Sequence, residues 1–165
     1  MQKLFKYIVF ICLSISSAYA QPDQISVDVS LGVFGTEGSS LSQVKFAKVG
    51  WQEDVWGALK QKISGGAWLD TRGQGFKSSG FTGYQLGFEV TNQVFQASVW
   101  SGPAFITSPD QDLGGNFQLN ETIFFGIVDK NYDTIGIVYN HLSSGGIEMP
   151  NLGKDFLGLQ IKWPF

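Results

Sequence analysis

Apolar residues occupy every second position in several stretches of this chain. Between residues 25 and 33 the alternation is unbroken, with apolar side chains at odd positions and polar residues or glycine at even ones. The same period covers residues 84–90, 117–127, 135–143 and 157–165, and in weaker form residues 41–51, 55–69 and 94–107. A period of two predicts β-strands with one apolar face, so we predict eight strands.

Residues typical of turns separate the predicted strands. Breaks rich in Gly or Asp are predicted at 36–38, 52–54, 70–80, 91–93, 108–112 and 129–133. Short antiparallel strands with abundant Gly and aromatic residues are typical of the smallest outer-membrane barrels. We therefore predict an all-β fold, an eight-stranded antiparallel transmembrane β-barrel of the bacterial outer membrane. A soluble barrel or a β-sandwich is the competing architecture.

The first 20 residues have the pattern of a secretory signal peptide. Lys3 and Lys6 give a positive start, an apolar stretch follows at 8–15, and residues 18–20 form a small-x-small cleavage pattern. We expect residues 1–20 to be removed and residues 21–165 to form a single β-barrel domain. After residue 20, no apolar run approaches the roughly 20 residues that a transmembrane helix needs, so any membrane crossing would use strands.

The end of the chain favours the membrane barrel over its soluble rivals. Gly158, Ile161, Trp163 and the terminal Phe165 resemble the C-terminal signal by which outer-membrane barrels are recognised for insertion. We therefore expect the barrel assembly machinery to be a partner. The sequence leaves open whether the barrel acts alone or as a homodimer.

Charge and cysteine content exclude several classes of function. The predicted signal peptide carries two of the 11 basic residues and none of the 14 acidic ones, so the mature chain would have a net charge of −5. An acidic chain does not offer the basic surface that nucleic-acid binding needs. The one cysteine, Cys12, lies in the predicted signal peptide, so the mature chain has no disulfide or thiolate metal site. We expect no metal and no cofactor.

Aromatic and charged residues also have predicted places in the barrel. We expect Glu89, Asp28 and Arg72 to be polar filling or rim residues of its interior. The tryptophans either form girdles at the membrane interfaces or belong to a core; they are Trp51, Trp56, Trp68, Trp100 and Trp163.

Candidate chemistry lies at the end of the stretch 135–143. His141, the single histidine of the chain, and Ser143 have the same parity as the apolar residues before them, and residues two apart share one face of a strand. Both termini of such a barrel are periplasmic, so this strand runs outward. A register that pairs Tyr139 with Leu157 sets His141 opposite Asp155, at a Cβ separation of about 5 Å. A base, a hydroxyl and an acid are therefore predicted on the outer wall, facing the outer leaflet.

Glu121 is a second acid that could flank the histidine. It interrupts the apolar stripe 117–127, and a turn centred on Asn131 places it opposite His141. One interpretation makes Glu121 an alternative acid for the histidine. The other, equally weighted, is an interfacial glutamate that reaches toward lipid headgroups.

The last 25 residues resemble a known family. The sequence has His141-Leu142-Ser143, then Gly146-Ile147, then residues 150–155 as Pro-Asn-Leu-Gly-Lys-Asp. This order resembles the H-x-S…P-N-x-G-x-E signature of the PagL lipid A 3-O-deacylases. The resemblance implies a serine esterase that removes the ester-linked acyl chain from position 3 of lipid A in lipopolysaccharide. It assigns the base to His141, the nucleophile to Ser143 and the orienting acid to Asp155.

Two positions depart from the family pattern. The family acid is glutamate, and Asp155 is one methylene shorter. The family has asparagine after the serine as an oxyanion donor, where this chain has Ser144. Loss of such a donor can cost roughly 100- to 1000-fold in rate. We expect the Ser144 hydroxyl, or backbone N–H groups around Gly145, to replace it.

A non-catalytic barrel is the alternative function. In an adhesin, a structural protein or a small-molecule binder, His141 and Ser143 would be ordinary residues of a membrane interface. The motif H-x-S alone does not separate the two classes.

Overall fold

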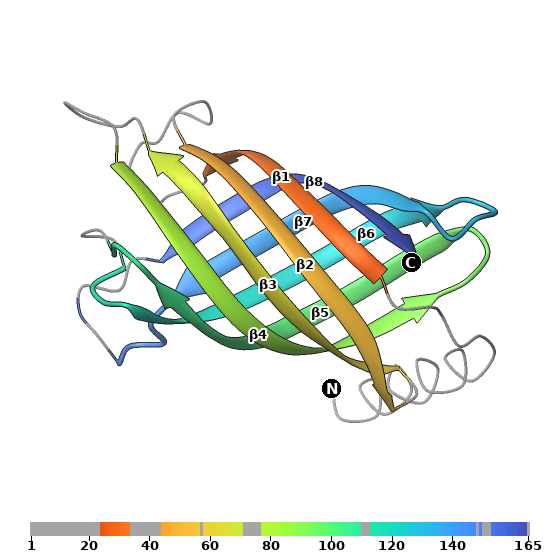
Figure 1. Cartoon of the computed structure of the whole chain (residues 1–165), viewed down its shortest axis with the longest axis horizontal. Helices are drawn as coiled ribbons and strands as arrows, with labels where there is room; N and C mark the ends of the chain where they lie inside the picture. The colour runs from red at the N-terminus through yellow and green to blue at the C-terminus, as the bar shows by residue number, and fades with distance from the viewer. Residues whose placement is uncertain are drawn as a thin grey trace, which may run out of the picture.

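The chain forms a closed antiparallel barrel. The computed structural model describes residues 24–33, 44–56, 58–70, 77–109, 113–147, 149 and 153–164, and the predicted signal peptide lies outside them. The strands are β1 (Gln24–Val33), β2 (Val44–Trp56), β3 (Leu59–Asp70), β4 (Lys77–Thr91), β5 (Phe95–Ile106), β6 (Phe117–Val128), β7 (Thr134–Ser143) and β8 (Lys154–Pro164). Each strand pairs with the next in sequence, and β8 pairs back with β1. Figure 1 shows the strong tilt of the strands and the end of β8 beside the start of β1.

The predicted all-β antiparallel architecture is confirmed, but one predicted break is wrong. Residues 52–54 do not form a turn; they continue β2, where Gln52 pairs with Lys62 and Asp54 with Lys60. The Lys60 ammonium lies 2.7 Å from an Asp54 oxygen. Polar residues can continue a strand here because the barrel has a polar interior. The predicted break at 70–80 is also too long, since β4 begins at Lys77.

The outer wall carries a broad apolar belt. Along β5, β6 and β7 exposed and buried positions alternate, and most of the exposed positions hold large apolar side chains. The same is true of the described parts of β2, β3, β4 and β8, and members of the belt include Val49, Ile63, Phe88, Val99, Ile123, Phe125, Ile137 and Leu159. So many exposed large apolar side chains on one wall are unusual for a water-soluble monomer. Among the described residues there is no helix long and apolar enough to cross a membrane.

The tryptophans divide between the two faces. Trp56 and Trp163 point outward, with 80% and 38% of their surface exposed. Trp68 and Trp100 lie inside, each 3% exposed, so a girdle of all five tryptophans is wrong. Parity is the reason, because in β3 and β5 the even positions face inward.

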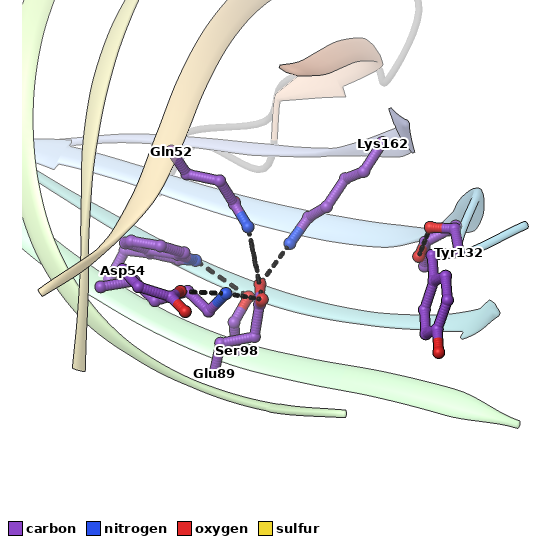
Figure 2. A network of polar contacts seen from close by, with 9 residues as sticks. Gln52, Asp54, Glu89, Ser98, Tyr132 and Lys162 are labelled. Atoms are coloured by element: carbon purple, nitrogen blue, oxygen red, sulfur yellow. Dashed lines mark hydrogen bonds and ion pairs between the residues drawn. The ribbon is translucent and has the colours of Figure 1, made fainter. Parts of the chain in front are cut away.

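One half of the barrel interior contains a network of ion pairs and hydrogen bonds around a buried carboxylate. Glu89, 3% exposed, accepts a hydrogen bond from the Lys162 ammonium at 2.8 Å and lies 3.2 Å from the Lys60 ammonium. The Gln52 amide donates to both Glu89 oxygens (Figure 2). A buried charge is costly unless it is paired, and here two cations converge on one anion. The interior position predicted for Glu89 is confirmed; the side chains of Asp28 and Arg72 lie outside the described ones.

The other half of the interior contains an apolar cluster, alongside buried polar side chains such as Gln118 and Lys154. Its core cluster consists of Trp68, Phe81, Ala104, Ile106, Leu113, Leu142 and Phe156. The Trp68 ring lies 6.1 Å from the Phe156 ring and 6.3 Å from the Phe81 ring, between centroids. Leu142 and Phe156 are the inward neighbours of His141 and Asp155 along their strands. This cluster therefore packs directly behind the residues to which the sequence assigns chemistry.

Replacing Phe156 by alanine tests this packing. The fully buried ring leaves a cavity, so we expect Phe156→Ala to lower the free energy of unfolding by about 3–5 kcal/mol in urea titrations of the detergent-refolded barrel. Phe105→Ala is the matched control, because Phe105 is 55% exposed on the outer wall and its removal opens no cavity. An equal loss for both variants would contradict a core behind β7 and β8.

Candidate active site

His141 and Asp155 face each other across β7 and β8. The register pairs Tyr139 with Leu157 and His141 with Asp155, which confirms the predicted pairing. The distance from His141 Nδ1 to Asp155 Oδ1 is 2.6 Å, and each side chain is about 30% exposed. A carboxylate accepts, so Nδ1 carries the proton in this contact and Nε2 is left as the basic nitrogen. The pair is thus arranged as an oriented general base.

Ser143 ends β7 on the same outer face as His141. It pairs with Leu119 of β6 and is half-buried. Its hydroxyl makes no hydrogen bond with any residue that the structure describes, including His141. Catalytic hydrogen bonds are often long without substrate and shorten in the complex, so the shared face is the relevant observation. The structure brings histidine and acid into contact, and Ser143 follows His141 by two residues on the same face of β7.

Gly153, the residue immediately before β8, borders the histidine ring. Its φ is +73°, a left-handed conformation that side chains other than glycine rarely adopt. A Cβ at this position would lie 2.9 Å from His141 Cε1 and 3.5 Å from Nε2. Glycine is therefore needed twice here, for the backbone turn and for room beside the ring edge that bears the basic nitrogen.

Tyr139 contacts the same carboxylate and was not among the predicted site residues. Its hydroxyl donates to Asp155 Oδ1 at 2.6 Å. Tyr139 lies diagonally across the strand pair from Asp155, within reach of a long side chain. In the sequence pattern Tyr139 counts only as one of the apolar residues of the stretch 135–143. Its parity and the predicted pairing with Leu157 were the signals that could have revealed its contact with Asp155.

Glu121 lies opposite His141 on the other side, in β6. This cross-strand pairing confirms the predicted register. Glu121 is exposed, and within the described part of the chain its side chain makes no hydrogen bond or ion pair. The carboxylate that contacts the histidine is therefore Asp155.

The residues proposed as oxyanion donors lie in a tight turn after β7. The Ile147 N–H donates to the Ser144 carbonyl at 3.1 Å, and both central residues have positive φ, +62° for Gly145 and +84° for Gly146. Ser144 is fully buried, whereas Ser143 is half-buried and Gly145 is exposed. The Ser144 hydroxyl is therefore the less accessible of the two expected oxyanion donors, and the backbone N–H of the exposed Gly145 is the other.

An apolar groove lies on the outer wall, one strand away from His141. Its volume is about 390 Å³. Leu86, Phe88, Val99 and Ile123 supply exposed apolar side chains to its lining, which also includes Glu121. Since Glu121 pairs with His141, the groove adjoins the candidate site. No group of three or more potential metal ligands occurs among the described residues.

Three comparisons relate the chain to known proteins. The family model for lipid A 3-O-deacylase (PagL) matches residues 38–164. The lipid A deacylase PagL of Bordetella bronchiseptica is 27% identical over 173 residues, which cover 96% of this chain and 93% of the relative. A crystal structure of the outer membrane enzyme PagL superposes with a TM-score of 0.58 at 18% identity, over 87% of this chain and 99% of that one. At that identity the superposition supports the fold alone.

NMR spectra of His141 can test the role of Gly153. The chain has one histidine, so its imidazole signals can be identified without ambiguity. We expect Gly153→Ala to shift the imidazole resonances of His141 because the new methyl group meets the ring edge. Gly146→Ala is the matched control: it imposes a similar left-handed strain, but its Cβ meets nothing within 4 Å. Unchanged histidine resonances in folded Gly153→Ala would show that the ring does not rest against this glycine.

Proposed function

Because this chain belongs to the PagL family of lipid A 3-O-deacylases, we propose that it hydrolyses the ester at position 3 of lipid A with His141, Ser143 and Asp155 as its catalytic triad. The family match covers most of the chain and makes it an ester hydrolase. The observation that carries the triad is the 2.6 Å contact between His141 Nδ1 and Asp155, with Ser143 on the same face. The alternative of a non-catalytic barrel is not favoured by these relatives.

The apolar outer belt supports a place in the outer membrane, and the structurally similar PagL is an outer membrane enzyme. Gln24 at the start of β1 pairs with Pro164 at the end of β8, so both terminal strands meet at one rim of the barrel. His141 and Asp155 lie toward the opposite rim. With the termini on the periplasmic side, the triad faces the outer leaflet, where lipopolysaccharide resides.

The proposed reaction is acyl transfer to water. His141 Nε2 takes the proton of the Ser143 hydroxyl as its oxygen attacks the ester carbonyl carbon. Asp155 holds the ring through Nδ1–H and stabilises the imidazolium. His141 then protonates the departing sugar oxygen, leaving an acyl-serine. Water, deprotonated by the same nitrogen, attacks this ester and releases the 3-hydroxy fatty acid and free serine.

An oxyanion donor and an acyl-chain groove complete the proposed site. The Gly145 N–H is the donor we assign to the oxyanion of the tetrahedral intermediate, because Gly145 is exposed and follows Ser143 by two residues. The apolar groove next to Glu121 would hold hydrocarbon chain of the substrate, since its lining matches the chemistry of an acyl chain. No metal or cofactor takes part in these steps.

Lipid A from cells that express the chain tests the proposed function. We expect mass spectra to show loss of one 3-hydroxyacyl group in a Gram-negative host that lacks such an enzyme. Ser143→Ala and His141→Ala should each lower turnover by roughly 10⁴-fold or more, because neither leaves a nucleophile–base pair. Heat-modifiable migration in gels shows that each variant still forms the barrel. Unaltered lipid A beside folded wild-type protein would count against this activity.

Separate substitutions distinguish the two acids. Asp155→Ala should lower turnover by roughly 10³- to 10⁴-fold, because the histidine loses its orienting carboxylate. Glu121→Gln should change turnover by less than about threefold, since Glu121 makes no hydrogen bond or ion pair with a described residue. Both are measured as initial rates on lipid A in mixed micelles. The reverse order of severity would assign the acid role to Glu121.

A further inference from the structure

A second donor shares the oxygen of Asp155 that His141 uses. Resting on the function proposed above, we propose that Tyr139 is a positioning residue of the triad, whose hydroxyl holds the Asp155 carboxylate in the orientation that accepts the His141 N–H. Tyr139 does not contact the reacting atoms in this proposal. It acts only through Asp155.

The geometry around Asp155 Oδ1 carries the inference. The Tyr139 hydroxyl and His141 Nδ1 each lie 2.6 Å from this one oxygen. Hydrogen bonds to an ionised acceptor are short and roughly twice as strong as neutral ones. Within the described residues, no other side chain donates a hydrogen bond to the Asp155 carboxylate. Tyr139 is thus the one described group besides the histidine that fixes its direction.

A carboxylate at this position needs such a restraint. The terminal torsion of an aspartate side chain has a broad, shallow preference, so a single hydrogen bond leaves the group free to swing. Asp155 is 30% exposed, and the carboxylate is not enclosed by packing. Tyr139 is half-buried in the middle of the β7 stripe, and its rigid ring presents the hydroxyl from a fixed place.

The restraint also relates to the length of the acid. Asp155 is one methylene shorter than the glutamate in the motif that the sequence resembles, so its carboxylate reaches less far toward the histidine ring. Two donors on one oxygen lock the short side chain at hydrogen-bond distance. The aspartate and the tyrosine therefore form one functional unit on the outer wall.

Tyr139→Phe tests the proposal because it keeps the ring and removes only the hydroxyl. We expect kcat to fall roughly 10- to 100-fold, the loss typical of a hydrogen bond to a charged group, with KM unchanged. Tyr84→Phe is the matched control: it removes an outer-wall hydroxyl that donates to Gln61 at 2.9 Å, on β4 and away from the triad. This control should retain wild-type kcat.

A double-mutant cycle separates positioning from other roles. In an Asp155→Ala background, Tyr139→Phe should have no further effect, because the residue through which Tyr139 acts is gone. An equal loss with and without Asp155 would overturn the proposal, as would an unchanged kcat in the single variant. A rise in KM at constant kcat would overturn it too, by making Tyr139 a substrate contact instead.

The single histidine supplies a readout independent of activity. We expect Tyr139→Phe to broaden or shift the Nδ1 proton resonance of His141, while Tyr84→Phe leaves it unchanged. This measurement stands even if the wild-type protein does not deacylate lipid A, an outcome that would refute the proposed function alone. An unaltered Nδ1 resonance in folded Tyr139→Phe would refute the positioning role.

Discussion

Backbone pairing between β7 and β8 holds His141 opposite Asp155, and everything else in the site depends on that register. A slip of one residue would turn the histidine and the acid to opposite faces of the wall, and a slip of two would part them. The register is itself held by the closed barrel, since β8 is paired on its other edge with β1. Ring closure thus supplies the precision that the same pair of side chains on an open sheet would have to obtain from loops.

The barrel interior supports this register in two different ways. Near the rim where the terminal strands meet, Lys60 and Lys162 neutralise the buried Glu89. Behind the candidate site, Leu142 and Phe156 pack in an apolar core with Trp68. Strands that carry chemistry on one face are therefore braced by dense packing on the other.

The sequence predicts the parts of this arrangement that follow from parity. Alternation locates the strands, counting from the turn at Asn131 gives Glu121 in β6 as one partner of His141, and the register that pairs Tyr139 with Leu157 gives Asp155 in β8 as the other. It fails where a polar side chain faces inward: it predicts a turn at residues 52–54, although Gln52 lies in a polar core. The same rule of alternation, applied one residue past Ser143, would have predicted an inward Ser144.

Tyr139 was missed for a different reason. A tyrosine in an apolar stripe satisfies the pattern, and hydrophobic patterning ignores its hydroxyl. The strand register also does not show which of the two carboxylates contacts the histidine, because Glu121 and Asp155 are both its cross-strand neighbours. The direction of each side chain determines the contact, and the direction of Asp155 depends on the diagonal hydrogen bond from Tyr139.

A position of the proposed triad on the outer wall determines the route by which the substrate would reach it. If the wall faces lipid, the ester reaches Ser143 by sliding sideways within the leaflet, and no tunnel or opening loop has to admit it. The rate at which enzyme and substrate meet then depends on the number of substrate molecules per unit area of the leaflet, and dilution of the cells does not alter this surface density. In that arrangement water would reach the serine from the rim that carries the exposed Gly145, whereas the lipid would reach it from the side.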